Sequence, residues 1–541
     1  MKNPSFLLIL LLFSTIKSLQ AQVLTTSNLP IVSIKTGGQT IVDEPKITAS
    51  MKIVELSAGL ATLADTGFLP SVQIGIEKRG TSSQDTYPKV GYAVETRDSS
   101  GASTDITPFG FPKNDDWVLV GPYNDKSLMR DALAYAIASE SMVYAPRASF
   151  IELVINNKYQ GVYLFLEKIK RGKNRVDISK LKPTDITGDQ LTGGYILKLD
   201  KPTGQVFDGW QSNFLPFPGA TQRTFFQYHY PKPEGIVKEQ KDYIQSFVYD
   251  FESNLNSNSY MDTVDGYVKY IDVDSWVDYL LVNEVSKNLD AYRLSTFMYK
   301  NRDSLDQKLH MGPVWDFNIA FGIGDYCDAG PYQGWAFDFN QQCPWDAWVI
   351  PFWWEKLMKD PLFKKKLADR WHFLRQNQWT NVKMLGKIDS MQTLLTQPQA
   401  RNFTRWPVLG TYVWPNFFIG QTWSSEVGYL RTWLTNRLFW MDGKIDAMVS
   451  VDTSYGLLKL VKPSPNPARG STFFEYLTPP GVDLTIELFD VSGHLLSYTE
   501  RLPTGKNGRF ELPLPEAAGV YFYRFKQNSK VVTTGKIVVI P

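Results

Sequence analysis

Prolines at every second position of the segment 463–467 divide this chain more clearly than any other feature. Neither a helix interior nor a central strand accommodates prolines at that density. Upstream, residues 250–445 carry apolar residues at three- and four-residue intervals, which indicates helices. Downstream, short alternating segments separated by Gly and Pro indicate strands. We therefore expect a linker at 451–470 and a small β-sandwich, of the immunoglobulin-like kind, at 471–541.

The first 21 residues predict a secretory signal peptide. Lys2 precedes an apolar run over 6–13, and small Ala21 stands at a suitable cleavage point. That run is too short to span a bilayer, and no later segment has 18 uninterrupted apolar residues, so we expect an exported chain without a transmembrane segment. The 57 basic and 55 acidic side chains nearly balance, which gives no indication of nucleic acid as a partner.

Two cysteines, Cys327 and Cys343, are the whole complement of the chain. In an exported protein, a pair 16 residues apart most simply forms a disulfide that closes a loop. Such a bridge stabilises the folded chain by about 3 kcal/mol in the chain-entropy account. The histidines are scattered without ligand spacing, which disfavours a metal site built on them.

Between the signal and the helical region, the sequence alternates between strand and helix patterns. Residues 23–70 form a β-rich segment, and the larger domain is expected over 71–450. Its first part predicts a hairpin of 72–77 with 92–96, followed by a helix at 125–137 with Asp125 as its cap. A second hairpin is predicted from 150–155 with 162–167. Helices are expected at 273–288 and 361–377.

Two aspartates predict the chemistry. Asp316 stands in Gly-Pro-Val-Trp-Asp-Phe-Asn, and Asp290 lies 26 residues before it. Phosphoryl transfer needs one carboxylate near the attacking hydroxyl and another that holds magnesium on the nucleotide phosphates. Two aspartates at this separation, the second between Trp and Phe, resemble the catalytic and metal-binding pair of a kinase-like phosphotransferase. A buried hairpin with Asp316 capping a turn remains an alternative.

The turn of the first hairpin and the end of the second offer nucleotide contacts. Arg79, Gly80 and Ser82 lie in a Gly/Ser-rich turn whose N–H groups and guanidinium suit phosphate oxygens. Lys89, just before the returning strand, is placed to reach a phosphate as a point charge. The order of hairpin, helix and hairpin resembles a kinase small lobe that leads into a large lobe, and this resemblance implies that the backbone at Glu167 and Lys168 is the hinge that contacts adenine. A plain hairpin would look nearly the same at the turn.

The order of these motifs resembles the CotH family, secreted or spore-coat proteins with an atypical protein-kinase fold that phosphorylate serine on proteins. The resemblance covers roughly residues 70–325 and weakens toward 440. It implies an α+β, two-lobed kinase-like domain that uses ATP with Mg²⁺ or Mn²⁺. The motifs that carry it are Arg79–Ser83, Pro88-Lys89, Asp116–Leu119, Asp125-Lys126, Arg130, Gly161–Leu164, Glu167-Lys168, Arg175-Val176 and Gly312–Phe317.

The resemblance also implies roles. Asp290 looks like the catalytic base for the substrate hydroxyl, and Asp316 looks like the magnesium ligand. Ser295 stands at the spacing where many kinases place a metal-binding Asn, and Asn318 stands where many relatives have a second Asp. Asp131 and Glu140 are two candidates for the acidic partner of the lysine, and the sequence does not choose between them.

The C-terminal strands resemble the sorting domain of the type IX (Por) secretion system of Bacteroidetes. That resemblance implies passage through the periplasm and across the outer membrane, with the secretion machinery as a partner of residues 471–541, and then release or surface attachment. An ordinary immunoglobulin-like appendage is the alternative. The motifs are Ser464–Ala468, Asp490–Gly493, Gly519–Phe522 and Gly535–Val539.

Three functions of different classes fit these features. The first is an exported Ser/Thr protein kinase acting on surface or secreted proteins. The second is a degenerate kinase fold that serves as a surface binding or adhesion protein, with an aromatic ligand face from Trp345 to Trp354 together with Trp406 and Trp414. The third is a secreted glycosidase with Asp290 and Asp316 as its two carboxylates.

Overall fold

The structure is a computed structural model of the chain. It describes all residues except 1–23, 66–67, 81–82, 202–207, 457–458, 461–462, 478–483, 500–501, 503–506 and 528–529. The predicted signal peptide and Ser82 therefore lie outside the described residues. In the part of the chain that is described, no helix combines the length and apolar character needed to cross a membrane. The chain forms two compact units, Met1–Met441 and Asp442–Pro541.

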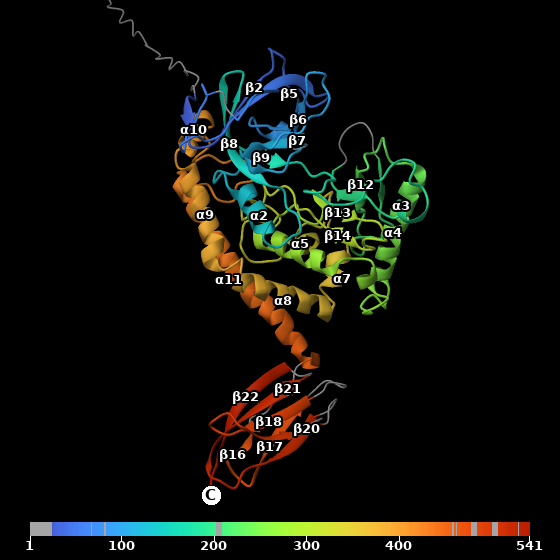
Figure 1. Cartoon of the computed structure of the whole chain (residues 1–541), viewed down its shortest axis with the longest axis vertical. Helices are drawn as coiled ribbons and strands as arrows, with labels where there is room; N and C mark the ends of the chain where they lie inside the picture. The colour runs from blue at the N-terminus through green and yellow to red at the C-terminus, as the bar shows by residue number, and fades with distance from the viewer. Residues whose placement is uncertain are drawn as a thin grey trace, which may run out of the picture. The chain divides into compact units, whose positions relative to one another are not determined.

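The first unit begins with a closed barrel, seen at the blue end of the chain in Figure 1. Neighbouring strands pair antiparallel, except that β2 and β8 pair in parallel and close the barrel. Alternate residues such as Ile76, Trp117 and Phe165 fill its interior, as the two-residue period of strands requires. The strands, in barrel order, are β2 (Ile31–Lys35), β3 (Ile47–Val54), β5 (Leu69–Arg79), β6 (Gly91–Arg97), β7 (Asp116–Val120), β9 (Lys158–Glu167) and β8 (Ala148–Ile155).

Two expectations for this region need correction. The predicted β-rich segment 23–70 is not separate, because its strands β2 and β3 belong to the same barrel as β5 to β9. The helix expected from residue 125 is α2 (Arg130–Ala138), which begins five residues later. Asp125 still acts at its start, since one carboxylate oxygen accepts from the Arg130 N–H at 2.8 Å and the other pairs with the Arg130 guanidinium at 2.5 Å. Short flanking elements are β1 (Thr26–Ser27), β4 (Ala61–Thr62) and α1 (Ser83–Thr86).

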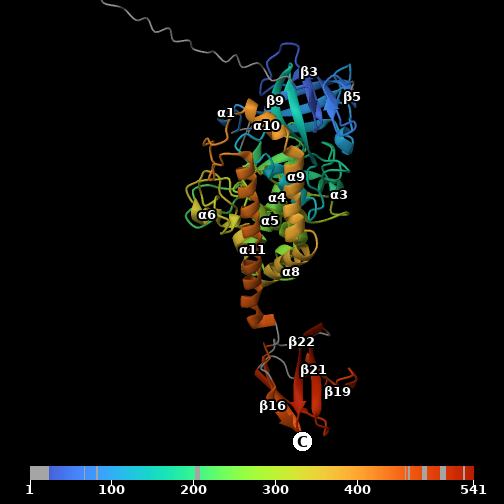
Figure 2. The same ribbon diagram turned by 90° about the vertical axis from the view of Figure 1, so that its left-hand side faces the viewer.

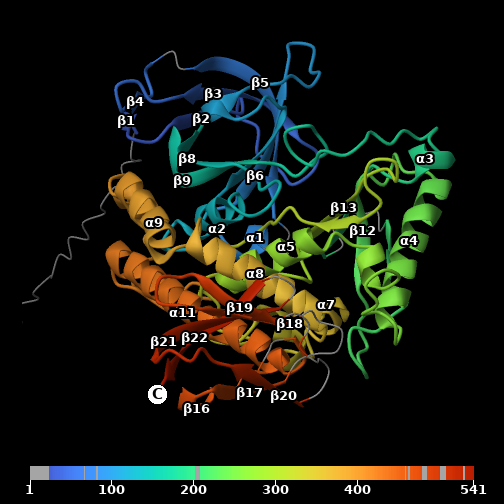
Figure 3. The ribbon, with the colours of Figure 1, turned by 60° about the horizontal axis from the view of Figure 1, so that its bottom comes forward.

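A second, five-stranded sheet follows the barrel. β10 (Tyr195–Leu199) lies at its centre between β12 (Phe225–Tyr230) and β13 (Thr296–Lys300), with β11 (Gly209–Gln211) and β14 (Leu309–Met311) at the edges. Helix α4 (Lys238–Asn256) lies beside β12 (Figure 3), where Gln245 donates to the Tyr228 hydroxyl at 2.7 Å. Helix α5 (Val273–Ser286) carries the chain from this sheet toward the Asp290 loop.

Helices complete the unit. α2 lies between the barrel and α5 in Figure 1, and α9 and α11 run alongside each other in Figure 2, joined by the ion pair of Arg431 with Asp389. Arg437 of α11 pairs with Glu284 of α5 at 3.0 Å, and both side chains are fully buried. The remaining helices are α3 (Gly188–Leu191), α6 (Phe339–Gln342), α7 (Trp353–Leu357), α8 (Pro361–Gln376), α9 (Asn381–Leu395), α10 (Pro398–Arg405) and α11 (Trp423–Gly456), with 3₁₀ turns at Pro108–Gly110, Tyr267–Lys269 and Ala336–Asp338.

The second unit begins with the end of α11, and the strands that follow have their own core, which includes Phe474, Ile486, Phe525 and Ile537. The linker predicted at 451–470 is wrong in part, because α11 runs to Gly456 and Ser464–Arg469 forms β16. The prolines fit there since β16 pairs only sparsely, through its end residues and Ala468. The other strands are β15 (Lys459–Leu460), β17 (Ser471–Leu477), β18 (Leu484–Phe489), β19 (Leu495–Thr499), β20 (Asn507–Pro513), β21 (Gly519–Gln527) and β22 (Lys530–Val539). The mixture of helices and several sheets is consistent with the expected α+β class.

Candidate active site

Helix α2 holds the Asp316 loop through the backbone. The Asp316 N–H donates to the Tyr135 hydroxyl at 3.3 Å, and the Phe317 N–H donates to Asp131 Oδ1 at 2.9 Å. The Tyr135 ring also packs against Trp315 and Phe317, with ring centroids 6.1 and 5.7 Å apart. One face of α2 therefore fixes the residues on both sides of the Asp316 side chain.

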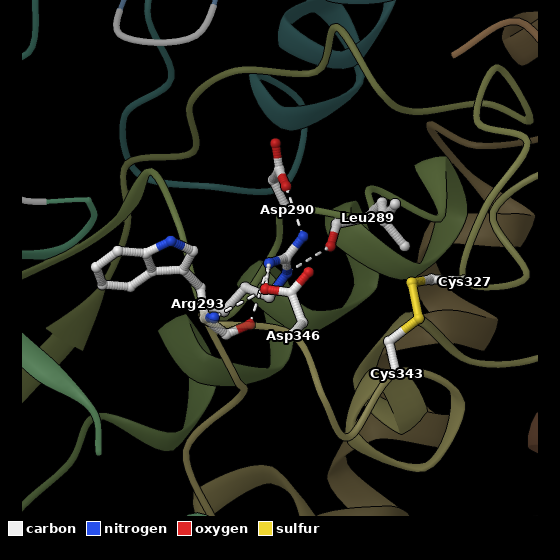
Figure 4. The surroundings of a disulfide bond; sticks show 7 residues. Leu289, Asp290, Arg293, Cys327, Cys343 and Asp346 are labelled. Carbon is white, nitrogen blue, oxygen red and sulfur yellow. Dashed lines mark hydrogen bonds and ion pairs between the residues drawn. A yellow bond between two sulfur atoms is a disulfide. The ribbon is translucent and has the colours of Figure 1, made fainter. Parts of the chain in front are cut away.

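The Asp290 loop is held by an arginine instead. Asp290 Oδ1 accepts from Arg293 at 2.8 Å, and the same guanidinium donates to Asp346 Oδ1 at 3.2 Å and to the Leu289 carbonyl at 3.1 Å. Figure 4 shows this cluster next to the Cys327–Cys343 disulfide, whose Cα atoms are 5.7 Å apart. The Asp346 N–H donates to the Cys343 carbonyl at 3.1 Å. The disulfide thus directly contacts the residue whose carboxylate holds Arg293.

Asn288 links the two loops. Its side-chain Nδ2 donates to the Asp316 carbonyl at 3.1 Å, and its Oδ1 accepts from the Asp290 N–H at 3.3 Å. The negative charge of Asp290 is also among the causes that raise the pKa of Asp316. The structure thus brings together the two aspartates that the sequence predicted as a pair.

Burial and like charges set the protonation of the Asp316 carboxyl. Burial, followed by the charges of Asp131 and Asp290, raises its pKa to about 8, and Arg79 opposes the shift. The pKa of Asp131 rises to about 7, mainly through burial. The Asp316 carboxylate has no hydrogen-bond or ion-pair partner among the residues that the structure describes. Asp316 is partly buried, and a carboxylate left without a partner in such a place is suited to a cation.

Arg79 brings positive charge from the barrel. It ends β5, and its guanidinium lies 4.8 Å from the centroid of the Trp315 ring. Burial lowers its pKa, while the negative charge of Asp316 raises it. The following Gly80 has a φ of 105°, and a Cβ there would lie 2.0 Å from Ser83 Oγ, so only glycine permits this turn.

A further cation adjoins Arg79. Lys168 lies 3.7 Å from Asp116, and burial lowers its pKa, with a contribution from the charge of Arg79. The pKa of His229 falls to about 4, chiefly through burial and with contributions from the charges of Lys168 and Arg79. Arg79 and Lys168 therefore contribute positive charge on the barrel side of the site, where Asp116 offsets part of the charge of Lys168, and Arg79, which has no ion pair within the described residues, suits an anionic ligand.

The donor set fits a magnesium ion that also contacts phosphates. Asn318 Oδ1 is buried without a hydrogen-bond partner, two residues after the unpaired Asp316 carboxylate. Within the described ranges, no group of three His, Cys, Asp or Glu side chains forms a closed metal cage. Magnesium does not need such a cage, because it takes oxygen ligands and is commonly held by one or two carboxylates together with substrate phosphates. Ser295, which was predicted as the metal ligand beside Asp316, has no contact with Asp316 among the described interactions.

Backbone strain concentrates at these loops. Asp316, Ser295 and Tyr292 have φ values of 61°, 46° and 70°, in the left-handed region that costs non-glycine residues free energy. Aspartate tolerates this region better than most residues, whereas a tyrosine there is unusual. Such strain persists where surrounding contacts impose it, and it clusters at functional sites.

The structure contradicts the phosphate contact predicted for Lys89. Its side chain is 2% exposed, and its Nζ donates to Asn402 Oδ1 at 2.8 Å and to the Pro122 carbonyl at 3.1 Å. The ammonium also lies 5.1 Å from the Tyr163 ring centroid. Protein groups therefore enclose the charge, and Arg79 is the cation that faces Asp316 instead.

The predicted hinge is also occupied by protein groups. The Glu167 N–H donates to the Arg147 carbonyl at 3.1 Å, and the Lys168 carbonyl accepts from Arg175 at 2.7 Å. The Glu167 carboxylate, fully buried, pairs with Arg147 at 3.0 Å. These groups brace β9, so an adenine contact through them is not available in this structure.

The aromatic ligand face expected from Trp345 to Trp354 does not form. Trp345 is 76% exposed, but Trp353 and Trp354 are 0% and 1% exposed and pack in the core. Trp406 is also buried, whereas Trp414 is 44% exposed and remains accessible.

Sequence reasoning missed Arg293, Asp346 and the roles of Asp131 and Tyr135 at the Asp316 loop. An arginine three residues after Asp290 is a visible signal, because side chains at that spacing meet in a helical turn. No local pattern points to Asp346, which lies 53 residues from Arg293 in sequence.

Residues 76–441 match the family described as CotH kinase protein, which is more than half of the chain. The chain belongs to the CotH family.

One curated protein with a similar sequence to this CotH chain is the inner spore coat protein H of Bacillus subtilis (strain 168). The two are 23% identical over 200 residues, which is 37% of this chain and 48% of that protein. The chain therefore matches about half the length of that relative. Among solved structures, the alkylpurine DNA glycosylase AlkC of Pseudomonas fluorescens, bound to DNA with an abasic site analogue, aligns at a TM-score of 0.12 and 10% identity, over 37% of this chain and 56% of that one. A TM-score that low supports no conclusion about fold or function.

Proposed function

We propose that this protein is an ATP-dependent protein kinase that transfers the γ-phosphate of ATP to serine or threonine. Family membership supports a kinase, and one observation carries the proposal: two aspartates from separate loops meet through Asn288, one ion-paired and one without a partner. Their environments differ in the way that a base and a metal ligand require.

Asp290 is the catalytic base in this proposal. Arg293 holds Oδ1, while Oδ2 has no hydrogen bond or ion pair within the described residues. Oδ2 accepts the proton of the substrate hydroxyl as that oxygen bonds to the γ-phosphorus. The bond between this phosphorus and the β–γ bridging oxygen breaks, and ADP leaves.

Asp316 and Asn318 would hold magnesium or manganese, and the ion would offset negative charge on the phosphates of ATP. Arg79 lies close enough to Asp316 to sense its charge, and Lys168 lies close enough to Arg79 to sense its charge, so both would help to neutralise phosphate charge. The metal site is thus expected to form fully only when nucleotide supplies further oxygen ligands.

We also propose that the protein acts outside the cytoplasm, attached to a surface or secreted. The spore-coat assignment of the Bacillus relative and the predicted signal peptide support this location. Residues 471–541 are proposed as the type IX sorting domain, on the motifs named above. Deleting residues 463–541 should leave the protein in the periplasm of the producing cell, and release of this truncated form into the medium would contradict the assignment.

The test of the activity is transfer of labelled phosphate from ATP to protein. The full chain is incubated with ATP, magnesium or manganese and a mixture of casein and synthetic serine peptides, and phosphorylated serine or threonine is identified by mass spectrometry. Incorporation that requires Asp290, with the folded Asp290→Asn variant as control, supports the proposal. Incorporation that is equal in wild type and Asp290→Asn contradicts it.

A further inference from the structure

A groove of about 410 Å³ lies on the first unit, which is within the size range of ligand sites. Its walls come from the segment just after α1 and from residues 407–414, and they carry the rings of Tyr87, Tyr123, Tyr412 and Trp414. None of its lining residues is Asp, Glu, Lys or Arg. The groove is therefore aromatic and uncharged.

Its outer wall is an exposed apolar surface. Tyr412 and Trp414 of the lining are 50% and 44% exposed, and Phe417, three residues beyond the lining, is 53% exposed, although a soluble surface usually scatters such side chains singly. Tyr412 is held in place, since its hydroxyl donates to Asp325 at 2.8 Å. Rigid, exposed aromatic side chains in one segment are a feature of binding surfaces.

The groove is continuous with the two catalytic loops. Trp414 stacks on Tyr326, with ring centroids 5.7 Å apart, and Tyr326 is the residue before Cys327 of the disulfide that adjoins Asp346. Asn416 donates to the Asn124 carbonyl at 2.9 Å, and Asn124 in turn donates to the Asn318 carbonyl at 2.9 Å. The same segment thus contacts the elements that hold Asp290 and those that follow Asp316.

Electrostatics agree with this geometry. The pKa of Tyr87 is raised by burial and by the charges of Asp316 and Asp290, and the pKa of Tyr326 is raised by burial and by the charge of Asp290. One residue of the groove wall and one ring stacked against that wall are therefore close enough to the carboxylates to sense them.

We propose that this groove binds the polypeptide substrate beside its phosphorylated residue, and that it selects uncharged flanking segments containing proline and small aliphatic residues. The inference rests on the proposed kinase activity, because it places the acceptor hydroxyl at Asp290. Extended proline-containing segments dock on aromatic-lined grooves with little loss of conformational entropy.

A carbohydrate is less suited to this groove. Sugar recognition needs side chains that hydrogen-bond hydroxyl groups as well as aromatic faces, but the groove lining has no carboxylate or amide side chain. The hydroxyls of Tyr87 and Tyr412 already donate within the protein, to the Trp414 carbonyl and to Asp325. The charge-free lining also separates this surface from the positive region near Arg79 that suits phosphates.

The test compares two fluorescent peptides with the same central serine. One has Pro-Val-Pro-Val on both sides of the serine, and the other has Gly-Asn-Gly-Asn. Binding to the full chain is measured by anisotropy without nucleotide, and phosphate transfer is measured separately with ATP and magnesium. We expect the proline peptide to bind at least tenfold more tightly and to show a correspondingly lower KM.

Tyr412→Ala and Trp414→Ala should each remove that preference by raising the Kd and the KM of the proline peptide to those of the Gly-Asn peptide. Trp345→Ala, which removes an exposed ring outside the groove, is the matched control. Equal binding of the two peptides, or an unchanged preference in both groove variants, overturns the inference. So does binding of cello- or chito-oligosaccharides that Trp414→Ala abolishes while peptide binding persists. Peptide binding without any phosphate transfer would support the groove as a peptide-binding site and reject the kinase proposal. Failure of the groove inference and failure of the kinase proposal are therefore distinguishable.

Discussion

The Asp290 and Asp316 loops place the same functional group in opposite environments. Asp290 is neutralised by Arg293, which Asp346 and backbone carbonyls hold in turn. Asp316 is fixed through its own backbone N–H and carbonyl and through the Phe317 N–H, and its carboxylate has no partner in the described part of the chain. Burial and nearby carboxylates raise the pKa of Asp316 to about 8.

The difference indicates a division of labour. An ion-paired carboxylate is already oriented, so it suits a step that needs fixed geometry, such as accepting a proton. A buried carboxylate without a counter-ion is unfavourable alone and gains most when a cation arrives. The same substitution, aspartate to asparagine, is therefore expected to have different effects on nucleotide binding in the two loops.

The largest expected effect comes from replacing either aspartate with asparagine. Asp290→Asn and Asp316→Asn should each reduce kcat for phosphate transfer by about 10³-fold, since one removes the base and the other the metal ligand. Only Asp316→Asn should also abolish magnesium-dependent nucleotide binding. Steady-state kinetics together with equilibrium nucleotide titrations separate the two, and identical losses of nucleotide affinity would remove the proposed distinction.

Arg293→Met is expected to have the next largest effect. It leaves Asp290 in the sequence but frees its carboxylate, so kcat should fall by about 10²-fold through misplacement of the base. Nucleotide affinity should not change, because Arg293 contacts the Asp290 loop and not the Asp316 carboxylate. Arg431→Met, which breaks a surface ion pair between α9 and α11, serves as control. A large loss of nucleotide affinity in Arg293→Met would count against the account.

Asp131→Ala should have a smaller effect, on the Asp316 loop alone. The substitution leaves the Phe317 N–H without its acceptor, so we expect about a tenfold higher magnesium concentration at half-maximal activity. Asp131→Asn retains an oxygen acceptor and should restore most of the metal affinity. If Ala and Asn variants respond alike, hydrogen bonding from α2 does not position Asp316.

The last expected effect concerns stability and pH and not catalysis. Because the folded pKa of Asp316 is about 8 and its ordinary value is 3.8, the folded protein keeps a proton there that the unfolded chain has released. The contribution of this group to the free energy of unfolding is therefore fully present below about pH 4, falls as pH rises, and is lost above about pH 8. Asp316→Asn should raise Tm relative to wild type, and the gain should grow from pH 5 to pH 8. A constant or shrinking difference would contradict the assigned environment.

Local sequence patterns predicted the individual helices and strands better than they predicted the closure of the barrel. The hairpins β5–β6 and β8–β9, the helices α5 and α8, and the strands β18, β20, β21 and β22 all follow from two- or 3.6-residue periods within their own sequence. The closure of the barrel by β2 with β8 joins residues about 120 apart, and no local period encodes such a pairing.

The same limit explains the errors in the site. Lys89 follows a turn, as a phosphate-binding lysine would, but Asn402 on a distant helix encloses it. The sequence identified both aspartates because flanking Trp and Phe mark Asp316, whereas the Arg293–Asp346 contact depends on the tertiary fold. Motifs thus indicated which residues carry chemistry, and packing decided which neighbours assist them.

The most direct test of the central claim is calorimetric titration of ATP into the full chain with and without magnesium, for wild type and Asp316→Asn. The account predicts that wild type binds ATP with a measurable heat only when the metal is present, and that Asp316→Asn shows no metal-dependent binding while remaining folded. Metal-dependent binding of equal affinity in the two proteins, or no binding to wild type with either magnesium or manganese, would contradict it.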